Sequence, residues 1–376
     1  MTDFRRELHL RHKREVHLRK ERLQASHERK LHSKYTITFP YGRKDQNCDV
    51  HWHAMSFEEN PEVYSGSVNK FPGMREICSK MSLFRCLDQM HELFPSEYDF
   101  YPRTWYLPAQ YHDFCTDVRR LHEKKIKPKP TFIIKPDIGA QGDGIYLLRD
   151  PNEYSSLNGR CHVAQEYLHN VYIIDKFKFD LRVYVLLKSM DPLEFYICKE
   201  GLARFSTVPY ENPTHKNLHE SYMHLTNYSL NKRNNAFNRS EREDEGSKRS
   251  LTSVLKKIEN EGHDSARVWK RIEEIVCKTI IAIVPEMKVE YQAAIPVGKP
   301  GPSCFEILGF DILLLDNLKP VLLEVNSAPS LSIDCEQEVS PGVFEYMPSQ
   351  KDEEVKRPLV RDTLLMVCPQ NKLRYW

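Results

Sequence analysis

The clearest pattern of apolar and polar residues in the chain lies between Cys304 and Ser330. The apolar runs GFDILLL and PVLLEV flank the short polar segment Asp316-Asn317-Leu318-Lys319, and this arrangement is typical of a β-hairpin. Because the runs are apolar at consecutive positions, we expect strands that are buried on both faces. A hairpin that closes symmetrically about this turn pairs residues that lie equally far from its centre.

The symmetric register predicts that three polar side chains meet. Asp311 lies opposite Glu324, and Asn326 lies opposite Gly309, on the same face as Glu324. Two carboxylates directly opposite each other are unfavourable in a sheet unless a positive charge lies between them. Since Asp, Glu and Asn supply oxygen ligands, we predict a Mg²⁺ site here. The alternative is a chance pair of charges on a solvated face, which the apolar flanks argue against.

The run KFKFDLRVYVLL predicts a strand with two different faces. Polar residues occupy one face and apolar residues the other, with Lys176, Lys178, Asp180 and Arg182 opposed to Phe177, Phe179, Leu181 and Val183. Two interpretations are open for the charged face. It lines a polar cavity, or it belongs to an edge strand and faces solvent.

A glycine-rich loop follows the apolar run that ends at Lys135. Gly139, Gly142 and Gly144 place three of the chain's 14 glycines within six residues. Such a loop lets backbone N–H groups approach a phosphate while the lysine supplies positive charge. The spacing is neither a Walker A loop nor a dinucleotide fingerprint, and glycine-rich hairpin turns are common.

Further elements follow from helical spacing and from breaks in the pattern. Helices are expected over residues 69–94, 109–125, 252–284 and 352–367. The stretch 192–207 predicts a hairpin with Lys199-Glu200-Gly201 at its turn, and residues 335–349 predict an irregular segment. The proline-rich break at 125–130 indicates a domain boundary. We therefore expect a basic arm (1–34), an N-terminal domain (35–127), a central domain (128–190) and a C-terminal domain (191–376).

Composition and charge narrow the class of protein. With 376 residues and 40% hydrophobic residues the chain can bury a large core, and no apolar run approaches the ~20 residues that span a bilayer. Ten cysteines lack zinc-type spacing and indicate reduced thiols in a cytosolic protein. The charged N-terminus predicts no secretory signal. Residues 1–34 hold 11 Lys and Arg against 5 Asp and Glu, so this arm favours an acidic partner.

Five segments taken together resemble the tubulin–tyrosine-ligase-like family, most closely its polyglutamylase branch. They are KPDIGAQGDGI, KFKFDLRVYV, HLTNYSLNK, GFDILL and LLEVNSAPSL. The resemblance implies an α/β ATP-grasp fold whose N-terminal, central and C-terminal domains hold the nucleotide between sheets. It also implies ATP and Mg²⁺ as cofactors, and a reaction that joins an amino acid to a tubulin carboxylate while ATP is hydrolysed to ADP.

The resemblance also implies residue roles. ATP-contacting residues would be Lys135, Gln141, Gly142, Gln165, Glu166, Tyr167, Leu168, Lys178, Phe179, Asp180, Thr226 and Asn227. Residues that hold the incoming amino acid would be Arg204, Tyr228, Lys248 and Asn326, and the magnesium ligands would be Asp311, Glu324 and Asn326. Lys135, Arg182 and Glu324 would act in catalysis. The magnesium set is the one that the hairpin register predicts independently of the family.

The expected activity is tubulin polyglutamylation through an acyl phosphate, with free L-glutamate and the acidic C-terminal tails of tubulin as substrates. No nucleic acid or membrane partner is expected, and the protein is expected to be a cytoplasmic monomer on the cytoskeleton, at cilium, basal body or centriole. The polyglutamylase branch typically carries a cationic extension after the catalytic core. This chain reaches only Trp376, so the basic arm is the expected substitute. The alternatives are an ATP-grasp ligase with a non-tubulin acceptor and an inactive microtubule-binding scaffold.

Overall fold

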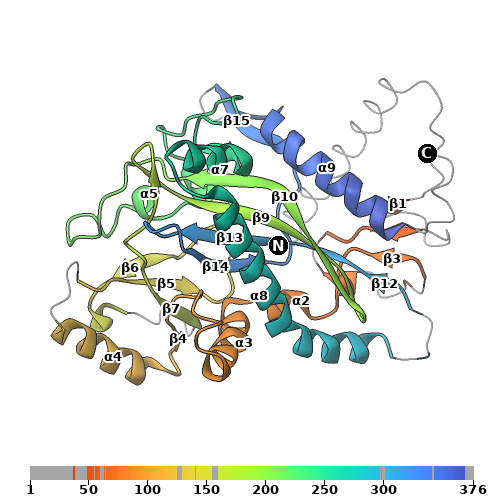
Figure 1. The fold of residues 1–376 in the computed structure, drawn as a ribbon, viewed down its shortest axis with the longest axis horizontal. Coiled ribbons are helices and arrows are strands. Elements are labelled where there is room, and N and C mark those ends of the chain that lie inside the picture. Colours follow the sequence, from red (N-terminus) through yellow and green to blue (C-terminus); the bar gives the residue numbers. More distant parts are fainter. Residues whose placement is uncertain are drawn as a thin grey trace.

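The computed structural model describes residues 37–38, 49–54, 56–59, 63, 65–124, 129–139, 141–154, 160–296, 298, 301–340 and 343–368. These residues form a mixed α/β fold with four sheets, as the fold-class prediction requires (Figure 1). The basic arm of residues 1–34 lies outside the described residues. Among the helices that are described, none combines the length and the apolar character needed to cross a bilayer.

A six-stranded sheet forms the centre of the fold. Its order is β11-β10-β9-β13-β14, with the short β8 also paired to β9, and all its neighbouring strands are antiparallel. The strands are β8 (Ile173–Ile174), β9 (Phe177–Met190), β10 (Leu193–Phe205), β11 (Lys248–Ser250), β13 (Glu306–Leu314) and β14 (Pro320–Asn326). Both strands of the predicted hairpin, β13 and β14, are therefore confirmed.

One face of this sheet packs against helices. Alternate residues of β9, including Phe179, Leu181 and Val183, join the largest apolar core together with Ile272 and Ile280. The helices on this side are α2 (Met74–Ile77), α3 (Lys80–Leu93), α7 (Leu251–Asn260) and α8 (Ser265–Ala294), and α8 runs across the sheet in Figure 1. Burial of this apolar face on helices leaves the polar residues of β9 on the opposite face.

Two predicted helices are each divided in two. Within 69–94, α2 ends at Ile77 and Ser79 caps the start of α3. The Ser79 side chain accepts a hydrogen bond from the Ser82 N–H at 3.2 Å. Within 252–284, Asp264 caps α8 by accepting from the Arg267 N–H at 2.9 Å. Such caps satisfy N–H groups that have no partner in the first turn. The helices predicted over 109–125 and 352–367 are confirmed as α4 (Tyr111–Glu123) and α9 (Gln350–Val367).

The second face of the central sheet is only partly covered. Helix α9 packs Val355 and Leu359 against Tyr184, Leu186 and Leu202 of the sheet. Beside this cluster lies a four-stranded sheet of β1 (Ile37–Thr38), β2 (Val50–His51), β3 (Ser67–Val68) and β12 (Ser303–Cys304), which contributes Val50. The charged part of the face continues beyond this apolar cover.

A smaller sheet stands opposite the charged part of the central sheet. Its order is β4-β7-β5-β6, with β4 (Thr104–Leu107), β5 (Phe132–Pro136), β6 (Tyr146–Leu148) and β7 (His162–Glu166). Helix α4 covers one face, where Phe114 packs on Trp105 and Phe132. Strand pairing crosses the predicted domain limits, since β4 joins β7 and β9 belongs to the central sheet. The domain division stays a prediction.

The predicted turn at Lys199-Glu200-Gly201 is wrong. Strand β10 runs through these residues with a bulge, and the chain reverses before it, where β9 ends at Met190 and β10 begins at Leu193. The Glu200 carboxylate accepts hydrogen bonds from the backbone N–H and the hydroxyl of Thr252, at 3.1 and 2.6 Å. This contact with the start of α7 stabilises a polar segment inside a strand, which a local pattern does not reveal.

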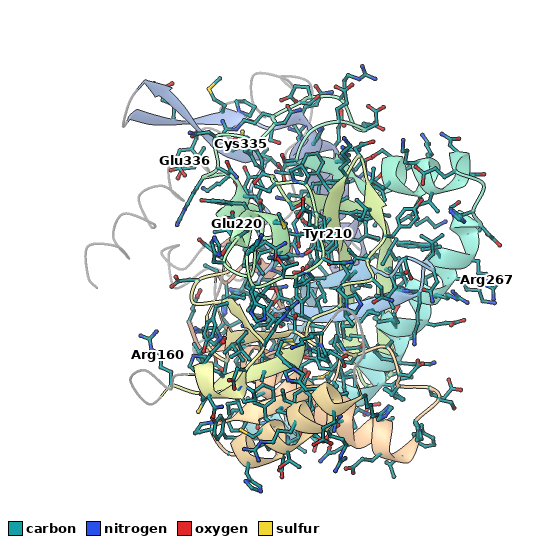
Figure 2. The ribbon with its side chains drawn as sticks, turned by 90° about the vertical axis from the view of Figure 1, so that its left-hand side faces the viewer. Arg160, Tyr210, Glu220, Arg267, Cys335 and Glu336 are labelled. Carbon is teal, nitrogen blue, oxygen red and sulfur yellow. The ribbon has the colours of Figure 1, made fainter. Side chains whose placement is uncertain are left out.

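The irregular segment predicted over 335–349 is also wrong. Residues there form the two-stranded antiparallel sheet of β15 (Asp334–Ser340) and β16 (Val343–Pro348). Figure 2 shows Cys335 and Glu336 at one end of the molecule, and Arg160 near the other end, beside the small sheet. The β15–β16 hairpin therefore lies far from the small sheet.

Candidate active site

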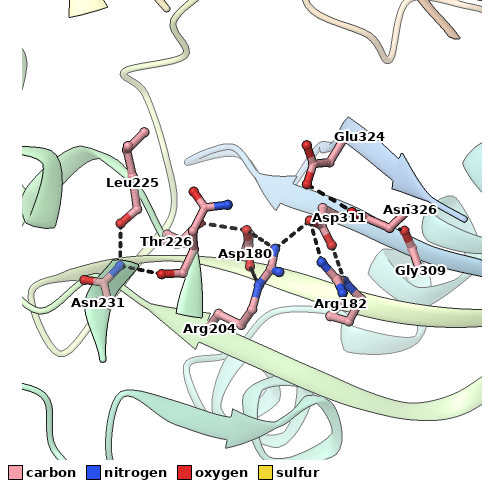
Figure 3. Close-up of polar contacts among 11 residues, drawn as sticks. Asp180, Arg182, Arg204, Leu225, Thr226, Asn231, Gly309, Asp311, Glu324 and Asn326 are labelled. Carbon is pink, nitrogen blue, oxygen red and sulfur yellow. Dashed lines mark hydrogen bonds and ion pairs between the residues drawn. The ribbon is translucent and has the colours of Figure 1, made fainter. Parts of the chain in front are cut away.

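The register of β13 and β14 brings the predicted magnesium ligands together. Asp311 is paired with Glu324 and Gly309 with Asn326, as predicted, and the register shifts by one residue between Asp311 and Ile312. The Asn326 Nδ2 atom lies 3.4 Å from Asp311 Oδ2 and 3.3 Å from Glu324 Oε1 (Figure 3). The predicted register is therefore confirmed at the site, and the pairing from Ile312 to the turn is shifted from it by one residue.

A row of charged side chains crosses the central sheet from β11 to β14. Lys248 is paired with Arg204, Arg204 with Asp180, Arg182 with Asp311, and Asp311 with Glu324. Directly opposite residues of antiparallel strands place their side chains on the same face. The charged face of β9 thus lines a polar cavity, and Lys178 and Asp180 are only 6% and 3% exposed. The edge-strand alternative is excluded for these residues.

Asp311 is the electrostatic centre of this row. Its carboxylate receives Arg182 Nη2 at 2.9 Å, Arg182 Nε, and Arg204 Nη2 at 2.7 Å. Burial by itself would raise the pKa of Asp311, but the two guanidinium groups outweigh it and hold this pKa well below its usual range. The pKa of Glu324 moves the other way, because burial and the neighbouring charge of Asp311 both raise it. The two carboxylates are therefore unlike in proton affinity.

Arg204 joins the carboxylates to the loop that was predicted to bind substrate. Its Nε and Nη2 atoms donate to Asp180 at 2.7 and 2.6 Å, and the Thr226 hydroxyl donates to the same carboxylate at 2.7 Å. Next to Arg204, the Lys248 ammonium lies 4.2 Å from the centre of the Tyr228 ring. The predicted amino-acid residues Arg204, Tyr228 and Lys248 are thus neighbours in space.

Two buried lysines lie between the two sheets, one on β5 of the small sheet and one on β9 of the central sheet. Lys135 donates to Gln165 Oε1 at 2.8 Å, and Lys178 donates to the Tyr167 hydroxyl at 3.0 Å. Burial lowers the pKa of Lys135 to about 8 and that of Lys178 to about 7. Removal from water favours the uncharged amine, so a bound anion would be needed to restore the full charge of both groups.

A cleft between the two sheets contains most of the predicted nucleotide residues. They come from the small sheet, the central sheet and the 224–227 segment, and the lining includes Lys135, Gln165, Glu166, Tyr167, Leu168, Lys178, Asp180, Arg204, Thr226, Asn227, Asp311 and Glu324. The lining also contains His224 and the apolar residues Pro102, Ile133, Ile145, Leu225, Leu313 and Leu323. An apolar slot with convergent charges suits a flat base joined to phosphates.

The glycine loop lies against this cleft through Asn227. Gln141 and Gly142 have φ values of 67° and 83°, in the left-handed region, and a Cβ placed on Gly142 would lie 3.3 Å from Asn227 Cγ. Phe179 differs from the other predicted residues. Its side chain belongs to the opposite face of the sheet, where it stacks on Phe205 with a centroid distance of 5.1 Å.

Several residues of the site have no counterpart in the sequence-based prediction. His224 is hydrogen-bonded to the Tyr167 hydroxyl at 3.0 Å and to the Asn217 carbonyl at 2.9 Å, and burial lowers its pKa to about 4. Lys80, at the start of α3, interacts electrostatically with Glu324 and Lys135. Leu313 could have been found from its alternation with Asp311. Leu323 could not, because it reaches the cleft through the bulge.

The residues of the site fit a nucleotide and a divalent cation. Lys135, Lys178, Arg182 and Arg204 are matched by four carboxylates, those of Glu166, Asp180, Asp311 and Glu324, and Lys80 adds one further positive charge. A triphosphate carries more negative charge than this one lysine offsets, so it requires an accompanying cation. No cluster of three or more His, Cys, Asp or Glu suited to a metal occurs in the described residues. Two carboxylates and the Asn326 amide are a donor set that suits Mg²⁺, which keeps waters and phosphate oxygens as its other ligands.

Comparison with known proteins adds independent information. A sequence model described as "Tubulin-tyrosine ligase family" matches residues 57–373. The human "Tubulin polyglutamylase TTLL11" is 53% identical over 339 residues, which cover 89% of this chain and 48% of that protein. The Caenorhabditis elegans "Tubulin polyglutamylase ttll-11" is 42% identical over 344 residues, 88% of this chain and 48% of that protein. The Danio rerio "Tubulin polyglutamylase ttll6" is 44% identical over 310 residues, 81% and 37% respectively. The chain spans about half the length of these curated relatives or less.

Proposed function

Because the chain belongs to the tubulin-tyrosine ligase family, we propose that it is an ATP-dependent carboxylate–amine ligase that adds glutamate to tubulin. The bond formed would be an isopeptide bond to glutamate side chains of the acidic C-terminal tails. The names of the curated relatives support tubulin as the acceptor. The carrying observation is the charged row from Lys248 to Glu324 on the central sheet. Four of its members line one cleft together with two desolvated lysines, Lys178 of the same sheet and Lys135 of the small sheet.

Each part of the cleft has a role in this proposal. Lys135 and Lys178 bind phosphates, the Gln141-Gly142 loop covers them, and the segment from Gln165 to Leu168, at the end of β7, lines the adenine. Asp311, Glu324 and Asn326 would hold magnesium, which when bound neutralises phosphate charge. The apolar lining excludes water from the phosphates, and low polarity strengthens every charge interaction there.

The chemistry explains why the site needs cations more than a nucleophile. A carboxylate is a poor electrophile, so the acceptor carboxylate first takes the γ-phosphoryl group, which gives an acyl phosphate and ADP. The amine of free glutamate then attacks the acyl carbon, and phosphate leaves as the isopeptide bond forms. Phosphoryl transfer depends mainly on positioning and charge neutralisation. In this proposal Arg182 and Lys135 supply both, which is supported by the pairing of Arg182 with Asp311 and by the position of Lys135 in the cleft lining.

Selection of glutamate is assigned to Arg204 and Lys248. Glutamate carries two carboxylates, and these two cations are cross-strand neighbours on the charged face of the sheet. Tyrosine and glycine offer one carboxylate each, so a site with two adjacent cations favours glutamate. Placement on the cytoskeleton, including the cilium, basal body or centriole, is part of the same proposal.

The test is mass spectrometry of tubulin tails after incubation with the protein, ATP, Mg²⁺ and a mixture of amino acids. The expected result is tails that carry added glutamate, with incorporation about 10²–10³-fold slower in the matched Glu324→Gln reaction. Modification of another added protein but not of tubulin would support the ligase with a different acceptor. Microtubule binding without any ATP consumption would support the inactive scaffold.

A further inference from the structure

A buried ion network joins helix α9 to the strand that carries Lys248. Asp352, in the first turn of α9, is 2% exposed. Its carboxylate pairs with the Lys248 ammonium, accepts from the Ser349 hydroxyl at 2.6 Å, and pairs with Lys356 Nζ at 2.8 Å. Every oxygen of this buried carboxylate therefore has a partner, and the carboxylate lies at the end of the charged row.

Helix α9 also holds the backbone on both sides of the site. Lys351 Nζ donates to the carbonyl oxygens of Lys248 and Glu245, both at 2.7 Å. Lys356 Nζ donates to the Ser332 carbonyl at 2.7 Å, in the segment that follows Asn326. The same helix face thus contacts β11 and the chain beyond β14. Its apolar residues pack on the same sheet face that carries the charged row.

These contacts determine where the Lys248 ammonium lies. A lysine is a point charge on a flexible stem, and it binds an anion well only when its position is fixed. Asp352 holds the ammonium on one side, and the Tyr228 ring lies on another at 4.2 Å. Lys248 and Lys356 share one carboxylate, so positive charge remains available to an anionic ligand.

We propose that Asp352 is a positioning residue for the incoming amino acid. Its carboxylate holds the Lys248 ammonium beside Arg204, so that the two cations face the two carboxylates of glutamate as a fixed pair. This inference rests on the proposed function, because it concerns the amino-acid part of that site. It adds a residue from α9 that lies outside the cleft lining and touches no reacting atom.

The first experiment compares Asp352→Asn with Glu353→Gln. Both changes remove one carboxylate from the same turn of α9, but Glu353 is on the exposed side, paired with Arg357. Asp352→Asn should raise the KM for glutamate about tenfold, equivalent to about 1.4 kcal/mol, with the KM for ATP unchanged. Glu353→Gln should leave both constants unchanged. A role limited to stability would move both constants together or neither.

The second experiment asks whether Asp352 acts through Lys248. In a Lys248→Met background, Asp352→Asn should raise the KM for glutamate no further. If Asp352→Asn does not fold, Asp352→Glu keeps the charge and displaces it by one methylene, and the same selective rise is expected. An unchanged KM for glutamate in an active Asp352 variant would overturn this inference but not the proposed function. The same holds if the effects of Asp352→Asn and Lys248→Met on this KM multiply in the double variant. A wild-type protein that incorporates no glutamate would overturn the proposed function together with it.

Discussion

The substitution Glu324→Gln separates the chemistry of the site from its stability. Asp311 and Glu324 are cross-strand partners, but Asp311 is held by Arg182 and Arg204, whereas Glu324 contacts Asp311 and Asn326. The amide keeps the shape of the side chain and removes one of two adjacent negative charges. We therefore expect a protein that is less active and slightly more stable.

The magnitudes follow from these contacts. Like charges directly opposite in a sheet destabilise by roughly 0.2–1 kcal/mol, so the variant should melt up to about 1 °C higher than the wild type. Loss of one of the three proposed magnesium ligands weakens charge neutralisation at the reacting phosphate and should lower kcat by about 10²–10³-fold. Asp311→Asn is the contrasting variant. It leaves two buried guanidinium groups without their shared carboxylate, and the free energy of unfolding should fall by about 3–5 kcal/mol.

The pH dependence of stability tests independently whether Glu324→Gln stabilises the protein. The folded-state pKa of Glu324 is raised above 4.5 by burial and by Asp311. A raised folded pKa contributes stability below the unfolded value, and this contribution is lost as the pH rises through the folded pKa. The stability advantage of Glu324→Gln should therefore be present at neutral pH and should disappear near pH 4.

Thermal unfolding at several pH values and incorporation of labelled glutamate into tubulin measure both effects. The wild type and Asp311→Asn serve as the two references. Wild-type turnover in Glu324→Gln would remove Glu324 from the metal site. A melting temperature several degrees below wild type would show that the Asp311–Glu324 repulsion inferred from the structure is wrong.

Three further predictions concern the cations. Arg204→Ala should raise the KM for glutamate more than the KM for ATP. Arg204→Lys keeps the charge but loses the bidentate contact with Asp180, so it should raise the KM for glutamate less. An equal KM for glutamate in the wild type and in both variants would place the amino-acid pocket elsewhere. Because the pKa values of Lys135 and Lys178 are about 8 and about 7, ATP binding should take up protons and weaken as the pH rises above 7; calorimetric heats that do not depend on the buffer would contradict this. Deletion of residues 1–34 should reduce microtubule pelleting most at low salt, and unchanged pelleting at every salt concentration would leave the arm without that role.

The β13–β14 hairpin shows how much of the site could be predicted from the local sequence pattern. Alternation and a polar turn fix which residues of β13 and β14 share a face, so the meeting of Asp311, Glu324 and Asn326 could be predicted from 27 consecutive residues. The bulge after Asp311 could not be predicted, because shifting the pairing by one residue does not change how apolar the two strands are. Leu323 enters the cleft only because of this bulge.

Strand ends depend on contacts that the local sequence does not contain. Lys199-Glu200-Gly201 has the composition of a turn, yet β10 continues through it because Glu200 binds the start of α7. In the same way, strands β15 and β16 pair although the alternation of polar and apolar residues in them is weak. At Glu200 the local preference for a turn is outweighed by a tertiary contact.

The sequence by itself determined which side chains of each strand lie on a common face, because side-chain direction alternates with every residue of a strand. It therefore determined the charged face of β9 and the oxygen ligands of the hairpin. Only the tertiary structure decided which strands are neighbours, and so that Arg204 meets Asp180, that Arg182 meets Asp311, and that Asp352 reaches Lys248. Those pairs join residues up to 129 positions apart, and their partners are selected by packing of the whole sheet between its helices.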